Sequence, residues 1–488
     1  MSASQLALFP ASEVFDAAGL ALCESLDAEF RRAQGITLTP GWLVELMLQR
    51  LAAAGPFQTI VDPGAGTGRF CMAAARRFPG ARVVAVERSE AMLAVLRRNL
   101  QSAGLVDRVE VVPGDFREVR VELSGRAAFV GNPPYVRHHD IEPAWKLWYA
   151  TTMARFGQRA SKLAGLHLHF LARIAELARP GDQLCFVTSA EWLDNGYGSA
   201  WRALLSERTG PLMVQGLWVA EPQTPVFPDA LVSALVLQAE MGTRSSSVSL
   251  GMLQEGALST SRVVPIASLL GEQRWTSLCQ AELTVPTVGV EVGELFKVTR
   301  GQVTGLNHAW VLPAGSEALP LALSVPAVTR AKEIIDGTVE AADGLSRLRR
   351  VVSLPADLAS LPAALRVRVD AFLATARALG AADGYVARQR RAWHALDLRV
   401  APAAMVSYMG RRAPVFRANP HAVSFLNIAH GLYPRQPLSG QQLRLILDFL
   451  NVHTDMRAGR MYGGGMAKFE PSDIARLRIP PAVLEPAH

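Results

Sequence analysis

The sequence has few cysteines and no long apolar run. Its four cysteines are spread over 488 residues and form no C-x-x-C pair, which argues against a disulfide framework or a zinc site. No stretch approaches the roughly 20 uncharged apolar residues that cross a bilayer. The first ten residues lack the basic start and apolar core of a secretory signal. We therefore expect a cytoplasmic protein without a bound metal.

The composition is that of a folded protein with more than one domain. Half of the residues are apolar and 19% are charged, and this length suits two or three domains. The formal net charge of +7 is compatible with a polyanionic partner. Arginine is dense between residues 330 and 417. The sequence therefore concentrates its positive charge in the second half.

The first half alternates short β-type runs with helical patterns, which predicts a parallel sheet covered by helices. Helices are expected at residues 70–78, 89–100 and 167–178, with Ser89 as an N-cap. The expected strands are residues 59–62, 82–87, 109–112, 127–130, 184–187, 212–219 and 232–237.

The pattern changes after residue 240. Residues 1–242 are predicted to form one domain, 243–285 a connecting segment and 286–488 a second domain. The second domain shows no βαβ rhythm and no internal repeat. Its expected helices are residues 326–335, 361–378 and 441–451.

A glycine loop follows the first expected strand. Gly64, Gly66 and Gly68 alternate with other residues directly after Asp62. Glycines at these positions allow a tight turn and a close approach of the backbone to a ligand. The spacing differs from that of dinucleotide-binding and P-loop motifs. A carboxylate at the strand end suits the sulfonium and the amine of S-adenosylmethionine.

Two further acidic positions support a site for S-adenosylmethionine. Glu87 ends the second expected strand, where a carboxylate can accept hydrogen bonds from both ribose hydroxyls. Asp115 and Phe116 follow the third strand, where they can hold the adenine amine and stack on the ring. The alternative, a plain strand-to-helix turn, does not account for these carboxylates.

Asn132-Pro133-Pro134-Tyr135 directly follows the fourth expected strand. In an open α/β sheet, ligands bind at the carboxyl ends of the strands. The two prolines stiffen the backbone and supply no N–H. The Asn132 side-chain oxygen and the Pro133 carbonyl are thus paired acceptors for an amine or amide nitrogen, and Asn132 is also expected to contact the cofactor. Tyr135 offers a face for stacking the target ring.

With these motifs in this order, the chain resembles the gamma-type amino-methyltransferases of DNA, the TaqI-like enzymes of restriction-modification systems. The resemblance covers nearly the whole chain. It implies a Rossmann-like class I methyltransferase sheet, mostly parallel with one antiparallel strand, and a C-terminal mixed α+β target-recognition domain. It also implies methyl transfer to the N6 amine of adenine in double-stranded DNA.

The same resemblance assigns three more positions. Thr39 and Pro40 match the segment that closes over the methionine end of the cofactor in this family. Residues 226–228, followed by the last expected strand, match a motif whose Phe packs against the extruded base. Phe227 and Tyr135 would then sandwich a flipped adenine. The family usually has an acidic or polar residue where this chain has residues 167–169, and we expect these histidines to be helix-packing residues or peripheral contacts.

Parts of the second half also resemble the recognition domains of this family. Arg300, Arg411, Arg412 and Lys468 are candidates for neutralising DNA phosphates. A separately encoded restriction endonuclease is a further partner compatible with the family. The matching segments are residues 297–307, 427–433 and 463–471.

Three alternatives remain open at this point. The N-P-P-Y motif also occurs in enzymes that methylate glutamine amides or RNA amines. A non-catalytic DNA-recognition subunit would share the fold. Adenine is favoured over cytosine by the resemblance alone, because the motif accepts either amine.

Overall fold

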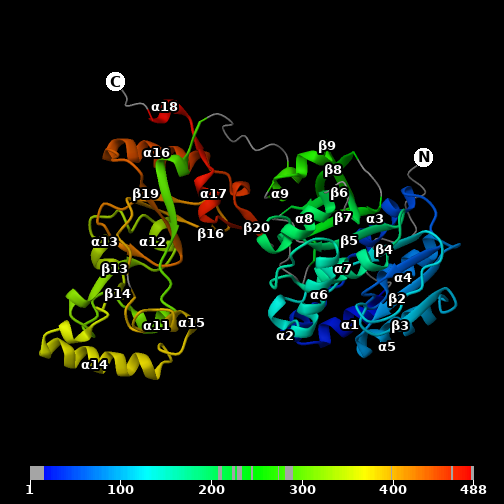
Figure 1. Cartoon of the computed structure of the whole chain (residues 1–488), viewed down its shortest axis with the longest axis horizontal. Coiled ribbons are helices and arrows are strands. Elements are labelled where there is room, and N and C mark those ends of the chain that lie inside the picture. The colour runs from blue at the N-terminus through cyan, green and yellow to red at the C-terminus, as the bar shows by residue number, and fades with distance from the viewer. Residues whose placement is uncertain are drawn as a thin grey trace. The chain divides into compact units, whose positions relative to one another are not determined.

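The computed structural model describes residues 16–206, 211–221, 226–227, 233–242, 246–272, 274–280, 289–396, 398–462 and 465–484 (Figure 1). The chain divides into two compact units. The first comprises residues 1–282 with 462–465, and the second comprises residues 283–461 with 466–488. No helix in these described ranges is both long and apolar enough to cross a membrane.

The first unit is built on a nine-stranded sheet with the order β3-β2-β1-β4-β5-β7-β6-β8-β9. The first seven strands in this order include every strand expected from the sequence. The strands are β1 (Thr59–Asp62), β2 (Arg82–Glu87), β3 (Val109–Pro113), β4 (Ala127–Gly131), β5 (Gln183–Ser189), β6 (Leu212–Ala220), β7 (Ala234–Met241), β8 (Ser247–Gln254) and β9 (Ala257–Pro265).

The strand directions confirm a mostly parallel sheet. Strands β3, β2, β1, β4 and β5 pair in parallel. Strand β7 is antiparallel to both β5 and β6, which makes it the expected reversed strand. Strand β9 is a second reversed strand that the sequence did not predict.

Strands β8 and β9 correct the expected connecting segment. The sequence predicts a connecting segment at residues 243–285, but residues 247–265 within it form two strands of the sheet: β8 pairs with β6, and β9 pairs with β8. Residues 243–245 and 281–288, at either end, lie outside the described residues.

Helices cover both faces of the sheet. Alternate residues of β2 separate two cores: Val83 and Ala85 pack with α3, α4 and α5, whereas Val84 and Val86 pack with α6, α7 and α8. This alternation follows from side chains pointing to opposite faces of a strand. The helices are α1 (Ala17–Ser25), α2 (Ala28–Gln34), α3 (Gly41–Ala53), α4 (Arg69–Arg77), α5 (Glu90–Ser102), α6 (Pro143–Arg155), α7 (Leu166–Leu177), α8 (Ser199–Ser206) and α9 (Thr276–Cys279).

The second unit contains two four-stranded sheets, β11-β19-β15-β17 and β12-β14-β13-β18. Helix α16 packs on the first sheet and α14 on the second. The strands after residue 283 are β10 (Val290–Glu291), β11 (Phe296–Arg300), β12 (Val311–Leu312), β13 (Ser324–Val328), β14 (Arg350–Val352), β15 (Ala404–Ser407), β16 (Met409–Gly410), β17 (Phe416–Ala418), β18 (Ser424–Phe425), β19 (Ala429–Pro434), β20 (Arg460–Tyr462), β21 (Met466–Lys468) and β22 (Arg478–Ile479).

The helices of this unit bear out two expectations and correct a third. Helices α14 and α16 lie where helices were expected, at residues 361–378 and 441–451. Residues 326–335 are instead split between β13 and the short α12, because β13 pairs with β14 and β18. The helices are α10 (Val292–Leu295), α11 (Asn307–Trp310), α12 (Lys332–Ile335), α13 (Gly344–Arg347), α14 (Ala363–Ala378), α15 (Tyr385–Arg388), α16 (Gly440–His453), α17 (Pro471–Ala475) and α18 (Pro481–Leu484).

Candidate active site

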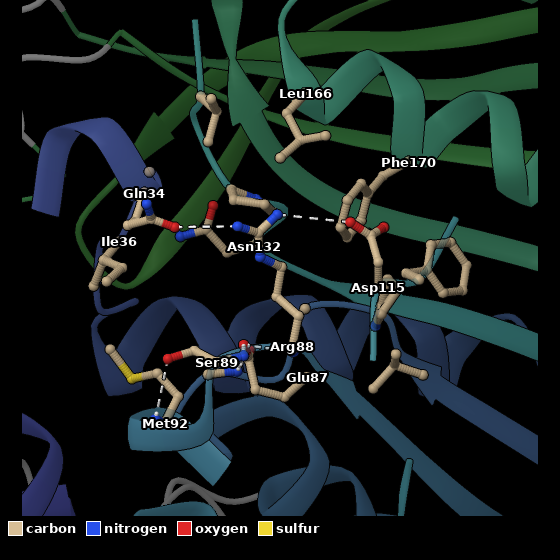
Figure 2. Close-up of a pocket in the computed structure, with 18 of the residues that line it drawn as sticks. Gln34, Ile36, Glu87, Arg88, Ser89, Met92, Asp115, Asn132, Leu166 and Phe170 are labelled. Atoms are coloured by element: carbon tan, nitrogen blue, oxygen red, sulfur yellow. Dashed lines mark hydrogen bonds and ion pairs between the residues drawn. The ribbon is translucent and has the colours of Figure 1, made fainter. Parts of the chain in front are cut away.

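A cavity of about 880 Å³, counted with its open mouth, lies at the carboxyl ends of β1 to β4. The loops after these strands, the first turns of α7 and the segment of residues 30–38 form its wall (Figure 2). Figure 2 shows Leu166 and Phe170 on one side and Glu87 and Ser89 on the opposite side, with Asn132 between them. The lining includes Gln34, Thr37, Leu38, Pro63, Gly64, Gly66, Val86, Glu87, Arg88, Ser89, Met92, Asp115, Phe116, Asn132, Pro134, Leu166 and Phe170.

The glycine loop makes the tight turn that its sequence predicts. Gly66 and Gly68 have φ angles of +54° and +98°, a backbone conformation that costs other residues energy. A Cβ on Gly68 would lie 2.4 Å from the Leu96 side chain. The loop thus leads from β1 directly into α4, and Gly64 and Gly66 line the cavity whereas Gly68 supports it from behind.

Backbone amides hold the carboxylate of Glu87 at the cavity wall. Its Oε2 accepts from the Gly66 N–H at 2.8 Å. Its Oε1 accepts from the N–H groups of Arg88 at 2.8 Å and Ser89 at 2.7 Å. Three donors to one carboxylate fix its direction, so the glycine loop and the start of α5 are joined through this side chain.

Asp62 is a buried carboxylate with one oxygen unpaired. The Cys71 N–H donates to its Oδ2 at 3.1 Å, while its Oδ1 is buried without a hydrogen-bond partner. Burial raises the pKa of Asp62 to about 8, and the nearby negative charge of Glu87 adds to the rise. An unpaired buried acceptor is costly, so Asp62 has a hydrogen-bonding capacity that no described group of the protein uses.

Asp115 lines the cavity, but its side chain is largely occupied. The Arg117 guanidinium donates to it at 2.9 and 2.6 Å and lies 3.8 Å above the ring of Trp145. Burial would raise the pKa of Asp115, but the hydrogen bonds from Arg117 outweigh it and lower the pKa. Arg88 lies 3.7 Å from the same carboxylate and donates to Gln34 at 3.3 Å. Phe116 is buried beside them and packs on Phe170.

The amide of Asn132 is held on one side only. Its Nδ2 donates to the Thr39 hydroxyl at 3.1 Å and faces the Thr37 carbonyl at 3.5 Å. Its Oδ1 is buried and has no hydrogen-bond partner. The structure thus leaves a preformed acceptor in the residue where one was expected. Pro133 is buried and Pro134 lines the cavity.

The structure brings Tyr135 and Phe227 together. Their ring centroids lie 6.0 Å apart and the rings meet edge to face at 61°. A base between two parallel rings needs about 7 Å, twice a van der Waals contact, so the two rings would have to separate and rotate to sandwich one. Residues 228 and 232 of the motif around Phe227 lie outside the described residues.

Several expected positions do not line the cavity. Thr39, Pro40, Asp62 and Gly68 lie behind its wall. Thr39 instead contacts Asn132, and Pro40 precedes α3 as its N-cap residue. Their expected contact with the cofactor therefore stays a prediction.

His167 and His169 are buried on α7. Burial lowers the pKa of His167 to about 4 and, with the positive charge of Arg117, that of His169 to about 3. His169 stacks on Tyr149 at 4.4 Å, and His167 lies 6.3 Å from Tyr135. Both rings are therefore neutral at pH 7 and poor proton acceptors.

Sequence reasoning missed the contribution of α7 to the cavity. Leu166 and Phe170 are four residues apart, a spacing that places them on one helix face. That spacing was a usable signal, since the helix itself was expected. Arg88 was also missed, and no pattern in the sequence marks it beyond its place after Glu87.

In the second unit, two expected DNA-binding residues pair with one carboxylate. Arg300 forms an ion pair with Glu470, and the Lys468 Nζ lies 2.8 Å from the same carboxylate. Arg411 and Arg412 are exposed and line a separate hollow beside Tyr408. Residues 463–464 of the expected recognition segment lie outside the described residues.

Comparisons with known proteins match both units. A family model for the C-terminal domain of the Type II methyltransferase M.Eco57I matches residues 279–487. Models of a methyltransferase domain and of the Eco57I restriction-modification methylase match residues 60–155 and 115–212. The Type II methyltransferase M.XamI of Xanthomonas campestris pv. amaranthicola is 41% identical over 451 residues, covering 91% of this chain and 85% of M.XamI. The chain belongs to the Type II methyltransferases of restriction-modification systems.

The order of its motifs places this Type II methyltransferase in the gamma type, as the resemblance implied. The glycine loop precedes the N-P-P-Y segment, and the region matched to the M.Eco57I C-terminal domain comes last. This confirms the family and the class I methyltransferase sheet.

Two more distant likenesses accompany this match. The Type IIL restriction-modification enzyme MmeI, solved in complex with DNA, has a TM-score of 0.54 at 10% identity, with 95% of this chain and 66% of that chain covered. At that identity the likeness shows the fold alone. The release factor glutamine methyltransferase of Chlorobaculum tepidum is 31% identical over 160 residues, 30% of this chain and 53% of that protein.

Proposed function

We propose that this Type II methyltransferase transfers a methyl group from S-adenosylmethionine to the N6 amine of a flipped-out adenine in DNA. One observation carries the proposal: the Asn132 Oδ1 is a buried acceptor without a partner in the residue that begins the N-P-P-Y segment. An acceptor left unpaired inside a protein is costly. Its presence is accounted for when a substrate amine supplies the missing donor.

The residues around the cavity fit S-adenosylmethionine. Its adenine ring suits the apolar wall of Phe116, Leu166 and Phe170. The fixed carboxylate of Glu87 can accept from the ribose hydroxyls. Asp62 does not line the cavity, but its unpaired Oδ1 lies at the glycine loop. We assign to its carboxylate the role of balancing the positive charge of the cofactor from behind the cavity wall. When bound, the cofactor supplies a methyl group on a positively charged sulfur.

The reaction requires the chain to hold a poor nucleophile in the right geometry. The lone pair of an exocyclic amine is delocalised into its ring. When the Asn132 Oδ1 and the Pro133 carbonyl accept its two hydrogens, the nitrogen can become pyramidal and direct its lone pair at the methyl group. Two consecutive prolines stiffen the backbone that carries the Pro133 carbonyl. The hydrogen bond to Thr39 holds the Asn132 amide, so the acceptor geometry is set before the substrate arrives.

No side chain is assigned as the base. His167 and His169 are neutral and have pKa values of about 4 and 3. Attack by the neutral amine on the sulfonium methyl group leaves a positively charged methylated nitrogen, which is acidic enough to lose one proton to water. We therefore assign neither histidine a proton-transfer role.

Tyr135 and Phe227 are proposed to contact the extruded base. They are neighbouring aromatic residues at the N-P-P-Y segment, and chemistry on a paired base requires its removal from the stack. Arg300, Arg411, Arg412 and Lys468 are proposed to contact the DNA backbone. MmeI, which shares the fold, was solved with DNA bound, and this supports DNA as the partner.

The test is methyl transfer in vitro with labelled S-adenosylmethionine. Plasmid DNA that has been incubated with the protein and digested to nucleosides should contain N6-methyladenine, and DNA treated with the Asn132→Ala protein should not. N4-methylcytosine would keep the enzyme class and change the base. Label found only in protein glutamine or in RNA would overturn the proposal in favour of the glutamine methyltransferase likeness.

A further inference from the structure

The contacts of the Asn132 amide decide which way it faces. A carbonyl oxygen can only accept, so the Thr37 carbonyl attracts the Nδ2 of Asn132 and repels its Oδ1. The Thr39 hydroxyl adds a shorter contact of 3.1 Å on the same side. The opposite side of the amide is left to the Oδ1, which is buried and unpartnered.

Thr39 is itself held by a buried network. Its carbonyl accepts from the Arg69 Nη1 at 2.8 Å, and the Arg69 Nε lies 2.8 Å from Asp16. Asp16 is fully buried and also accepts from the Thr67 hydroxyl at 2.6 Å and the Asn99 amide at 2.9 Å. The position of Thr39 is thereby tied to the glycine loop and to helices α4 and α5.

The orientation of the amide matters because its two ends differ in chemistry and barely differ in shape. If the amide of Asn132 flipped by 180°, its NH₂ group would replace the acceptor. Two NH₂ groups would then face each other, and neither can accept a hydrogen bond. The flipped form would bind substrate poorly and hold its nitrogen in the wrong geometry.

We propose that Thr39 is a positioning residue whose hydroxyl holds the Asn132 amide in the orientation that the acceptor-only Thr37 carbonyl selects, with the Oδ1 presented to the substrate. The Arg69–Asp16 pair keeps Thr39 in place. This rests on the proposed function of Asn132, and it assigns Thr39 to the acceptor rather than to the cofactor. In keeping with that role, Thr37 and Leu38 line the cavity whereas Thr39 does not.

The matched variants are Thr39→Val, which keeps the shape and removes the acceptor, and Thr39→Ser, which keeps the hydroxyl. In single-turnover assays with saturating S-adenosylmethionine, Thr39→Val should slow transfer by about ten- to a hundredfold. Cofactor affinity measured by calorimetry should stay within about twofold, and Thr39→Ser should transfer at nearly the wild-type rate. Thr39→Ala serves as a second variant if the valine form does not fold.

Two kinetic results would overturn the proposal. One is an unchanged transfer rate in the folded Thr39→Val protein. The other is a weakened cofactor affinity whose effect disappears at saturating S-adenosylmethionine, since Thr39 would then hold the cofactor directly.

A second measurement does not depend on activity. The chain has seven asparagines, so selective ¹⁵N labelling gives few side-chain NH₂ signals, and Asn132→Ala identifies the one of interest. In the Thr39→Val protein, the Asn132 NH₂ signal should shift and its hydrogens should lose their protection from exchange with water. In the Thr39→Ser protein, both the position of the signal and the protection should stay as in the wild type. An unmoved signal in Thr39→Val would contradict the proposal. This result holds whether the substrate is DNA or another amine, so it separates this inference from the proposed function.

Discussion

The candidate functional groups of the two units differ in burial and in whether they already have partners. In the first, Asp62 and Asn132 carry buried oxygens that no group in the described chain satisfies. In the second, Arg300 and Lys468 share the carboxylate of Glu470, and the Arg300 side chain is half exposed. The first arrangement is prepared for a small ligand that completes it. The second suits a polyanionic partner whose phosphates would replace the Glu470 carboxylate as the partner of Arg300 and Lys468.

The difference predicts how each unit responds to change. Buried acceptors act over short distances and are little affected by salt, whereas exposed cations act on a polyanion through counterion release. Variants of the first unit should therefore change the chemistry or the cofactor affinity. Variants of the second should change DNA affinity and its salt dependence.

The largest effect is expected for Asn132→Ala. The lost Oδ1 acts on the amine during transfer, so the single-turnover rate should fall by about a thousandfold. Cofactor affinity from calorimetry and DNA affinity from a gel-shift titration should stay within a fewfold of wild type.

Two outcomes would contradict the division for Asn132→Ala. A large loss of DNA affinity would mean that the first unit carries part of the DNA contact. A large loss of cofactor affinity would place Asn132 in the cofactor site. The Thr39→Ser protein is a suitable control, since it changes a neighbour of Asn132 and keeps the hydrogen bond.

The first unit was the more predictable from sequence. Residues 59–62 and 82–87 coincide with β1 and β2 because short apolar runs between turn residues are typical of buried strands. Glu87 and Asn132 were placed at one cavity because parallel strands end at the same edge. The sequence did not reveal that the Arg117 guanidinium pairs with the Asp115 carboxylate. The rotamers of both side chains and the packing of Arg117 on Trp145 decide that contact.

The second unit was predicted less well, for a physical reason. Residues 326–335 carry apolar residues at helical spacing, yet β13 forms because Ala327 and Val328 pair with Ser424 and Phe425. Such pairing between distant segments leaves no local periodicity, and it overrides local preference. The same reason hides the pairing of Arg300 and Lys468 with Glu470, which is 170 residues from Arg300.

A smaller effect is expected from the proton on Asp62. Its pKa of about 8 means that it is mostly protonated at pH 7, and a cationic ligand should require its ionised form. Cofactor affinity should then rise about tenfold per pH unit below the pKa and level off above it. Calorimetry at pH 7 in buffers of different ionisation enthalpy should detect about one released proton.

Asp62→Asn is the control for this proton. It should remove the pH dependence and weaken cofactor binding. The unliganded wild type should lose unfolding free energy as the pH rises from about 4 to about 8, because the folded state keeps a proton that the unfolded state releases. A pH-independent affinity in the wild type would exclude Asp62 from the cofactor site.

In the second unit, replacing Arg411 and Arg412 with alanine should weaken DNA binding by about tenfold. If each contacts one phosphate, the slope of log K against log salt should fall by about one per residue, equally for all sequences. Arg97→Ala with Arg98→Ala, an exposed pair on α5 of the first unit, removes the same charge. Equal losses of DNA affinity in both double variants would indicate an effect of net charge. That result would contradict the assignment of the DNA contacts to the second unit.

The smallest effect, and the most specific, is expected for Glu470→Gln. Removal of the carboxylate releases Arg300 and Lys468 for phosphates, so DNA affinity should rise a fewfold and the salt slope should steepen. Asp343→Asn, which breaks the exposed pair with Arg347, adds the same charge and should leave the affinity nearly unchanged.

Glu470→Gln should also lower stability, with a defined pH dependence. Burial would raise the pKa of Glu470, but the hydrogen bonds from Lys468 and Arg300 outweigh it and lower the pKa. Its contribution to stability is therefore present above about pH 4.5 and is lost as the pH falls through the lowered value. The variant should melt below wild type at pH 7, and the two should converge in acid. A stability loss without a gain in DNA affinity would mean that these cations stabilise the second unit and do not face DNA, which would leave Arg411 and Arg412 as its proposed phosphate contacts.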